Sequence, residues 1–198
     1  MHVGAGKVTF LGHELSESGI RQDPEKLKAI RKLPLPANAK EVRQVMGLMS
    51  YYRQFIGNFA TIAKPLTAPM RKSVEFQWTQ HHQEAFNLLK QRLCTNPTLG
   101  HFNHHDKVQL KTDASRKGIG GILLQQQKEC WVLKACCSCR LSEVEENYAV
   151  TDLEGLTVVY AMDKFRNYLL GRKFILLIDY CALCALRKRT PQSPRLRR

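Results

Sequence analysis

Apolar residues in the first part of the chain predict a short sheet followed by a helix. The segment KVTFLGHELSESGI predicts a short strand, a glycine turn and a second strand closed by the Ser18-Gly19 pair. Asp23-Pro24-Glu25 is a helix-start pattern, because Asp caps free amides, proline fits the first helical position and Glu complements the positive helix end. Pro34 and Pro36 require this helix to end by Leu33.

Helical spacing continues through the next segments. A second helix is expected after Asn38, where Glu41 follows three residues later as in a capping box. Its apolar stripe consists of Val42, Val45, Met46, Met49, Tyr52, Ile56 and Phe59. A third, short helix is expected over residues 61–70 with an interruption at Pro65, and a fourth begins at Thr79 and ends before residue 97. Residues 24–95 are therefore predicted to form a compact helical unit.

The pattern changes to strands in the second half of the chain. Residues 107–113 alternate as a strand does, and strands are also expected over 118–125 and 131–138. A helix over 143–169, a strand over 174–178 and a short helix over 181–186 follow. The order β-β-β-α-β-α predicts a mixed α/β domain.

Three acidic residues of this domain are candidates for chemistry. Asp113 and Asp179 are expected at the carboxyl ends of apolar strands, the edge where α/β folds usually place ligands. Glu154 is expected at the margin of the sheet-facing helix stripe formed by Val150, Leu153, Leu156 and Tyr160. A carboxylate at the edge of a buried face is costly unless it is paired or holds a metal ion. The three could hold divalent cations for phosphodiester cleavage, although Asp commonly begins turns and a helix-edge Glu can pair with Lys or Arg.

The composition of the chain predicts a polyanionic partner. The 198 residues include 31 Lys and Arg against 17 Asp and Glu, a net charge of +14. The excess is concentrated in residues 1–100 and 187–198, so the α/β segment is nearly neutral. Seven cysteines, an odd number in a chain without an export signal, argue against a disulfide framework and indicate a reducing compartment. The first residues lack a signal-peptide core, and apolar runs such as FILLI are far shorter than a membrane helix, so an intracellular location and no membrane partner are expected.

Long strings of the sequence resemble the Pol polyprotein of gypsy-type LTR retrotransposons. VTFLGHELSESGI is similar to the end of the reverse-transcriptase palm, with FLGH as the primer-grip hairpin. DPEKLKAIRKLPLPANAKEVRQVMGLMSYYRQFIGNFATIAKPLT resembles the thumb, and FQWTQHHQEAFNLLKQRLCTNPTLGHF the connecting segment. LKTDASRKGIGGILLQQ and the stretch from RLSEVEENYAV to LLIDYCALCAL resemble a ribonuclease H domain. The order and spacing of these strings make a chance match improbable.

The resemblance implies an α+β chain: a short β-hairpin and helical thumb-like unit followed by a truncated ribonuclease H-like mixed α/β domain. The corresponding segments are the palm end at 1–22, thumb and connection at 23–100, ribonuclease H-like domain at 101–186 and a basic tail at 187–198. Asp113, Glu154 and Asp179 fall on the family's metal-binding carboxylates, which implies Mg²⁺ or Mn²⁺ and an RNA–DNA hybrid or template–primer as the partner. The expected nucleic-acid-binding residues are Phe10, Leu11, Gly12, His13, Lys40, Arg43, Arg53, Arg71 and Lys72.

Departures from the family pattern leave alternatives open. No pair of adjacent aspartates occurs in the sequence, so polymerase activity is not expected in this chain alone. The final strand of the family's domain and the helix that carries its fourth catalytic acid are also not found in this sequence. Hydrolysis of the hybrid is therefore expected only if three carboxylates suffice for catalysis. The first alternative is a catalytically inactive nucleic-acid-binding remnant. A weaker one is a zinc module formed by Cys136, Cys137, Cys139, Cys181 and Cys184, which the strand position of the first three disfavours.

Overall fold

The computed structural model describes residues 6–67, 69–70, 76–95 and 98–178 of the chain. These residues form two compact units. The first comprises residues up to Ile56 together with Ile62–Phe102, and the second comprises Gly57–Thr61 together with the chain from Asn103 onward. A five-residue segment of the helical region therefore packs with the second unit, although the chain on both sides of it belongs to the first.

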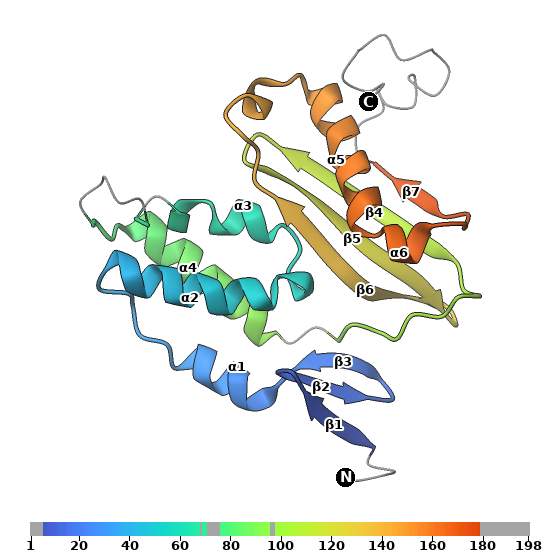
Figure 1. Ribbon diagram of the computed structural model, residues 1–198, viewed down its shortest axis with the longest axis horizontal. Helices are drawn as coiled ribbons and strands as arrows, with labels where there is room; N and C mark the ends of the chain where they lie inside the picture. Colours follow the sequence, from blue (N-terminus) through green and yellow to red (C-terminus); the bar gives the residue numbers. More distant parts are fainter. Residues whose placement is uncertain (1–5, 68, 71–75, 96–97, 179–198) are drawn as a thin grey trace. The chain divides into compact units, whose positions relative to one another are not determined.

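The first unit begins with a three-stranded antiparallel sheet (Figure 1). Its strands are β1 (Lys7–Phe10), β2 (His13–Ser16) and β3 (Gly19–Gln22), in that order across the sheet. The expectation of two strands closed at Ser18-Gly19 was incomplete. Beyond that turn the chain pairs again, because Gly19 has a φ of +130° that L residues rarely adopt and returns the chain along β2.

Local sequence signals determine where the first two helices begin. Helix α1 (Pro24–Arg31) begins where the Asp23 side chain accepts a hydrogen bond from the backbone N–H of Glu25 at 2.9 Å. Helix α2 (Ala39–Tyr51) begins at Asn38, whose Oδ1 accepts from the N–H of Glu41 at 2.9 Å. Both caps were predicted, because they depend only on residues adjacent to the helix start.

The other helices in the first part of the chain are shorter than the apolar stripe indicated. Helix α2 ends at Tyr51 and is followed by a 3-10 turn at Arg53–Phe55, so the stripe that continues to Phe59 spans several elements. Helix α3 (Phe59–Ala63) precedes a second 3-10 turn at Pro65–Thr67, and helix α4 (Gln80–Cys94) comes next. The buried core of the unit includes Leu27, Ile30, Val42, Met46, Met49, Tyr52, Phe55, Leu66, Phe86, Leu89 and Leu93.

The second unit contains a four-stranded sheet with the order β6-β5-β4-β7. Strands β4 (Val108–Ser115), β5 (Gly118–Gln127) and β6 (Cys130–Cys139) are antiparallel, and β7 (Ile175–Leu177) runs parallel to β4. The four predicted strands are thus observed at nearly the predicted positions. Parallel pairing of β7 with β4 requires the crossover that the intervening helices provide.

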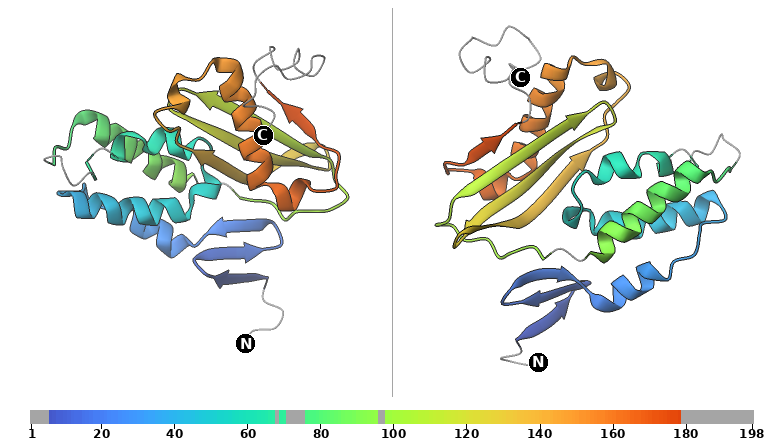
Figure 2. Two further views of the ribbon diagram at one scale, coloured as in Figure 1. Left: turned by 45° about the horizontal axis from the view of Figure 1, so that its top comes forward. Right: turned by 180° about the vertical axis from the view of Figure 1, so that it is seen from behind.

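Helix α5 (Val150–Lys164) covers one face of this sheet, and Figure 2 shows from behind that the helix lies on the far side of the strands. The single helix expected over 143–169 was wrong. The structure has a 3-10 turn at Glu145–Asn147, then α5, then α6 (Arg166–Leu169). A Cβ at Gly121 would lie 2.8 Å from the Cβ of Ala161, so the absent side chain lets α5 pack closely on β5.

The expected helix 181–186 and the basic tail lie outside the described residues. Across the parts of the chain that the structure describes, no helix combines the length and apolar character needed to span a membrane.

Candidate functional site

Asp113 lies within β4 rather than at its end. The strand continues to Ser115, and Asp113 pairs across the sheet with Gly120 of β5. Thr112 is buried on the side of the sheet that α5 covers, whereas Asp113 is exposed and leaves the sheet on the other face. Its carboxylate oxygen Oδ2 accepts a hydrogen bond from Nδ2 of Asn58 at 2.9 Å.

Glu154 lies in the first half of α5 and is 6% exposed. The expected stripe was wrong only at Val150, which is half exposed; Leu153 is buried, and Leu156 and Tyr160 pack against the cluster that contains it. Thr157 and Ala161 are fully buried as well, so Glu154 lies on the buried side of the helix rather than at its margin. A carboxylate buried to this degree requires polar or ionic compensation.

The third predicted carboxylate, Asp179, lies outside the described residues. Within the described ranges, no group of three His, Cys, Asp or Glu side chains is placed to hold a metal ion. The two described acids suit a hard divalent cation by their chemistry, because Mg²⁺ and Mn²⁺ prefer carboxylate oxygens. Convergence of the three carboxylates stays a prediction.

The FLGH segment forms a tight turn with exposed apolar residues. Phe10 is 60% and Leu11 70% exposed, and Leu11 and Gly12 have φ values of +47° and +73°. A leucine in the left-handed region is strained, so its surroundings must hold it there. The carbonyl oxygens of the turn accept hydrogen bonds from two tyrosines: Tyr51 Oη donates to Leu11, and Tyr52 Oη donates to Gly12 at 2.9 Å.

His13 follows this turn and packs among aromatic rings. Its ring stacks on Tyr51 with a centroid distance of 5.3 Å and meets Tyr52 edge-on at 5.6 Å. Burial lowers the pKa of His13, although a hydrogen bond to the backbone of Arg21 opposes the shift. The neutral ring is therefore favoured, and His13 supports the turn by packing rather than by charge.

One face of α2 is exposed and carries most of the predicted basic residues that the structure describes. Lys40 and Arg43 are both exposed, and Nη2 of Arg43 donates to the carbonyl oxygen of Met70 at 2.7 Å. Tyr51 lies eight residues beyond Arg43 and is 51% exposed. Gly47 lies between them on the same helical face, and a Cβ added there would meet no atom within 4 Å.

Of the other predicted basic residues, Arg53 is exposed in the 3-10 turn that follows α2, and Arg71 and Lys72 lie outside the described residues. Gly47 and Asn58 were not among the residues predicted from the sequence. The spacing of residues 43, 47 and 51 could have indicated a shared helix face, but no local signal connects Asn58 to a strand 55 residues away.

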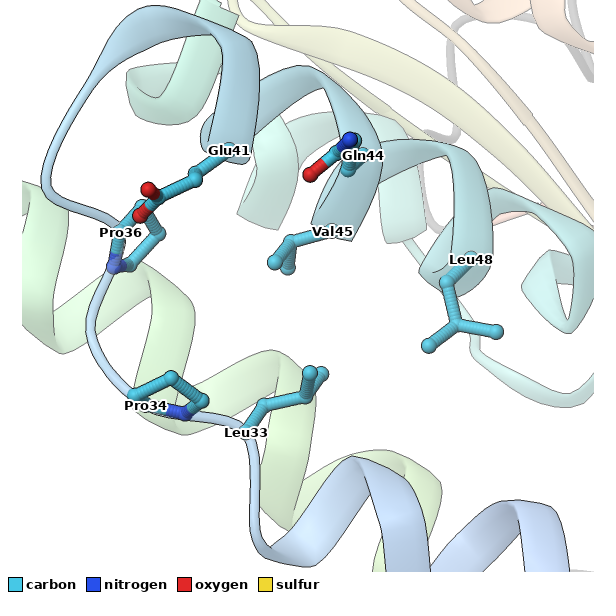
Figure 3. A pocket seen from close by; sticks show the side chains of 7 residues that line it. All are labelled: Leu33, Pro34, Pro36, Glu41, Gln44, Val45 and Leu48. Atoms are coloured by element: carbon cyan, nitrogen blue, oxygen red, sulfur yellow. The ribbon is translucent and has the colours of Figure 1, made fainter.

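A shallow apolar groove lies beside α2, between the helix and the loop after α1 (Figure 3). Its volume is about 260 Å³, and its lining residues are Leu33, Pro34, Pro36, Glu41, Gln44, Val45 and Leu48. The carboxylate in this groove is already used by the local fold. Glu41 Oε2 accepts from the N–H of Ala37 at 2.7 Å, and its Oε1 accepts from Nδ2 of Asn38 at 2.8 Å.

The cysteines of β6 lie in a setting typical of core thiols. Cys136 and Cys137 are both buried, and as strand neighbours they point to opposite faces of the sheet. Burial raises the pKa of Cys136 to about 12, so the thiolate that zinc requires is disfavoured there. Cys181 and Cys184, the other members of the predicted zinc group, lie outside the described residues.

Comparison with known proteins gives a consistent family assignment. Residues 78–176 match the family described as RNase H-like domain found in reverse transcriptase. The chain is 37% identical over 175 residues to the retrovirus-related Pol polyprotein of transposon 297, and 34% identical over 180 residues to that of transposon gypsy, both from Drosophila melanogaster. These alignments cover 88% and 85% of this chain but only 16% and 17% of the relatives, so the chain spans about a sixth of their length.

Solved structures show the same fold. The foamy viral protease-reverse transcriptase in complex with RNA/DNA hybrid aligns over 96% of this chain and 27% of its own, with a TM-score of 0.75 and 23% identity. The same enzyme in complex with dsDNA aligns over 93% of this chain and 39% of its own, with a TM-score of 0.74. The expected combination of a helical unit and a ribonuclease H-like α/β unit is confirmed at the level of fold. The chain therefore belongs to the family of RNase H-like domains found in reverse transcriptases, and its predicted resemblance to gypsy-type retrotransposon Pol polyproteins is confirmed.

Proposed function

We propose that the chain binds an RNA–DNA hybrid or template–primer through its first unit, with the exposed face of α2 and the FLGH turn as the contact surface. The observation that carries this proposal is Gly47. A glycine inside a helix costs about 1 kcal/mol relative to alanine, and nothing in the surrounding fold would obstruct a methyl group at this position. The fold therefore gives no reason for a glycine there.

Binding of a nucleic-acid duplex would explain the glycine at position 47. Lys40 and Arg43 offer positive charge to phosphates before Gly47 in α2, and Tyr51 offers an aromatic surface after it. Without a side chain at position 47, a nucleic-acid backbone or groove edge can approach the helix closely between them. The structures of foamy viral protease-reverse transcriptase that share this fold contain an RNA/DNA hybrid or dsDNA, which supports a duplex as the ligand class.

The Gly47→Ala variant tests this surface by two effects of opposite sign. Alanine is expected to raise the midpoint of thermal unfolding by roughly 2–4 °C, because it favours the helix. The added methyl group is expected to weaken hybrid binding roughly tenfold, or about 1.4 kcal/mol. Circular dichroism melting and fluorescence anisotropy with a labelled hybrid measure the two effects on the whole chain.

Gly6→Ala is the matched control, because Gly6 belongs to the same unit and an added Cβ there also meets no atom within 4 Å. The control is expected to leave hybrid affinity unchanged. A Gly47→Ala protein that is stabilised and binds the hybrid as tightly as the wild type would show that this face of α2 does not contact the duplex.

A second proposed activity is hydrolysis of the RNA strand of the bound hybrid. We infer that Asp113, Glu154 and Asp179 hold Mg²⁺ or Mn²⁺, which would activate water and stabilise the leaving oxygen. The chemistry of the three carboxylates and the family to which the chain belongs support this role, although Asp113 leaves the sheet on the face opposite α5, which carries Glu154. Cleavage of a labelled hybrid, measured beside Asp113→Asn, tests it. Binding without cleavage would favour the alternative of an inactive nucleic-acid-binding protein.

A further inference from the structure

The turn between β1 and β2 contains a leucine where its backbone favours a smaller residue. Phe10 and His13 pair across the two strands, so Leu11 and Gly12 form the whole turn, and both have a positive φ. Such turns favour Asn, Asp or Gly, because the Cβ of most residues crowds the backbone in this conformation. Leu11 is also 70% exposed, so its side chain contributes little to the core. The fold therefore gives no reason for a leucine at this position.

Two tyrosines at the end of α2 hold this turn. Tyr51 Oη donates a hydrogen bond to the carbonyl oxygen of Leu11, and Tyr52 Oη donates to that of Gly12 at 2.9 Å. The Gly12 carbonyl oxygen also accepts from the backbone N–H of Asp23 at 3.0 Å. A Cβ at Gly12 would lie 3.1 Å from Tyr52 Oη and 3.5 Å from Tyr51 Cε1, so both side chains approach the turn closely. The end of α2 therefore holds the backbone of the turn in its left-handed conformation.

Tyr52 is the member of this pair that cannot contact a ligand itself. It is 1% exposed, whereas Tyr51 is 51% exposed. Burial raises the pKa of Tyr52, and the charge of Asp23 raises it further, so the hydroxyl keeps the proton that it donates. The ring meets Tyr51 and His13 edge-on, with centroid distances of 5.0 and 5.6 Å. An effect of the Tyr52 hydroxyl on ligand binding must therefore act through the turn.

We propose that Tyr52 is a positioning residue, which holds the Leu11 side chain in place to pack on the nucleic-acid duplex beside the exposed face of α2. The inference rests on the proposed function, in which this turn and this helix face form the contact surface. Leu11 carries no charge, so its contact is with sugar carbons and base edges rather than with phosphates. The hydrogen bonds from α2 thus join an apolar contact to the phosphate contacts proposed for Lys40 and Arg43.

Tyr52→Phe removes the hydroxyl and keeps the ring. In the whole chain, fluorescence anisotropy with a labelled RNA–DNA hybrid is expected to show roughly fivefold weaker binding than the wild type, because one hydrogen bond to the turn is lost. The slope of log K against log salt is expected to stay unchanged, because the phosphate contacts remain. Weaker binding with a reduced slope would show that the change disturbs α2 itself, and would overturn the proposal.

Tyr160→Phe is the matched control for this variant. The Tyr160 hydroxyl also donates to a backbone carbonyl oxygen, that of Ser138, at 2.9 Å, but it belongs to the second unit. The control is expected to bind the hybrid like the wild type. An equal loss of affinity in the two variants would show that the effect does not arise at the turn, and would overturn the proposal.

Leu11→Ala separates positioning from a general effect on folding. Alone, it is expected to weaken hybrid binding roughly tenfold, because it removes the apolar contact. Leu35→Ala, which changes another exposed leucine of the same unit, is expected to bind like the wild type. The Leu11→Ala/Tyr52→Phe double variant is expected to bind as Leu11→Ala does, because no leucine remains to be positioned. Additive losses would mean that Tyr52 acts independently of Leu11, and would overturn the proposal.

The hydrogen bond itself is measured without nucleic acid by NMR of the His13 backbone amide, which follows the Gly12 carbonyl. Its signal is expected to shift in Tyr52→Phe and to stay in place in Tyr160→Phe. An unchanged signal in Tyr52→Phe would overturn the proposal. A wild-type chain that binds no hybrid would overturn the proposed function, and the positioning role with it. Hybrid binding that is unaffected by Leu11→Ala or by Tyr52→Phe would overturn the positioning role alone.

Discussion

Asp113→Asn is expected to cleave an RNA–DNA hybrid at least about 100-fold more slowly than the wild-type chain in Mg²⁺ or Mn²⁺, a loss of roughly 2.7 kcal/mol of transition-state stabilisation. The substitution removes the negative charge that a hard cation requires but keeps the shape of the side chain. The amide oxygen introduced at position 113 can still accept from Asn58 Nδ2, so the fold is expected to be retained. Hybrid affinity is expected to stay within about twofold of the wild type, because phosphate contacts dominate it.

Asp163→Asn provides the charge-matched control for this assay. Asp163 is an exposed residue near the end of α5, and its replacement removes the same charge from the same unit. It is expected to cleave at the wild-type rate. Equal cleavage by the wild-type and Asp113→Asn proteins would show that the activity does not arise at this carboxylate.

Gly19→Ala is expected to lower the stability of the first unit by about 2–3 kcal/mol. Gly19 has a φ of +130°, and an added Cβ would lie 2.3 Å from the carbonyl oxygen of Leu99. The neighbouring bridge depends on this close approach: Ile20 N donates to Leu99 O at 2.8 Å, and Leu99 N donates to Ile20 O at 2.9 Å. Alanine therefore adds backbone strain and separates β3 from the chain that follows α4.

Urea unfolding of the whole chain, followed by far-UV circular dichroism, measures this loss. Gly6→Ala serves again as the control, since it adds the same methyl group in open space. An unfolding midpoint for Gly19→Ala that equals the wild-type value would contradict the close packing of β3 against Leu99.

The sequence predicted features that depend on nearby residues. The caps at Asp23 and Asn38 were predicted because donor and acceptor are two or three residues apart. The long stripe after Asn38 was wrong in extent, because an apolar residue such as Phe59 can be buried from a separate helix as well as from the same one. Periodicity reports burial, and it does not report where one helix ends and another begins.

Features that depend on packing between distant segments were not predicted. Helix α5 approaches β5 closely at Ala161 because Gly121 has no side chain, and the sequence of the helix alone does not reveal this fit. Asn58 reaches Asp113 across 55 residues of sequence, and only the folded second unit brings them together. The sequence pattern and the resemblance to retrotransposon polyproteins both indicated the candidate carboxylates, whereas the hydrogen bond between Asn58 and Asp113 required the structure.

Binding of a nucleic-acid duplex by the exposed face of α2 is tested most directly by the salt dependence of hybrid binding. The Lys40→Ala/Arg43→Ala chain is compared with Lys26→Ala/Arg92→Ala, which removes one exposed lysine and one exposed arginine from α1 and α4 of the same unit. Loss of two phosphate contacts is expected to reduce the slope of log K against log salt by roughly 2 in the first variant only. Equal slopes for the two variants would mean that net charge alone drives binding, and would contradict a specific surface on α2.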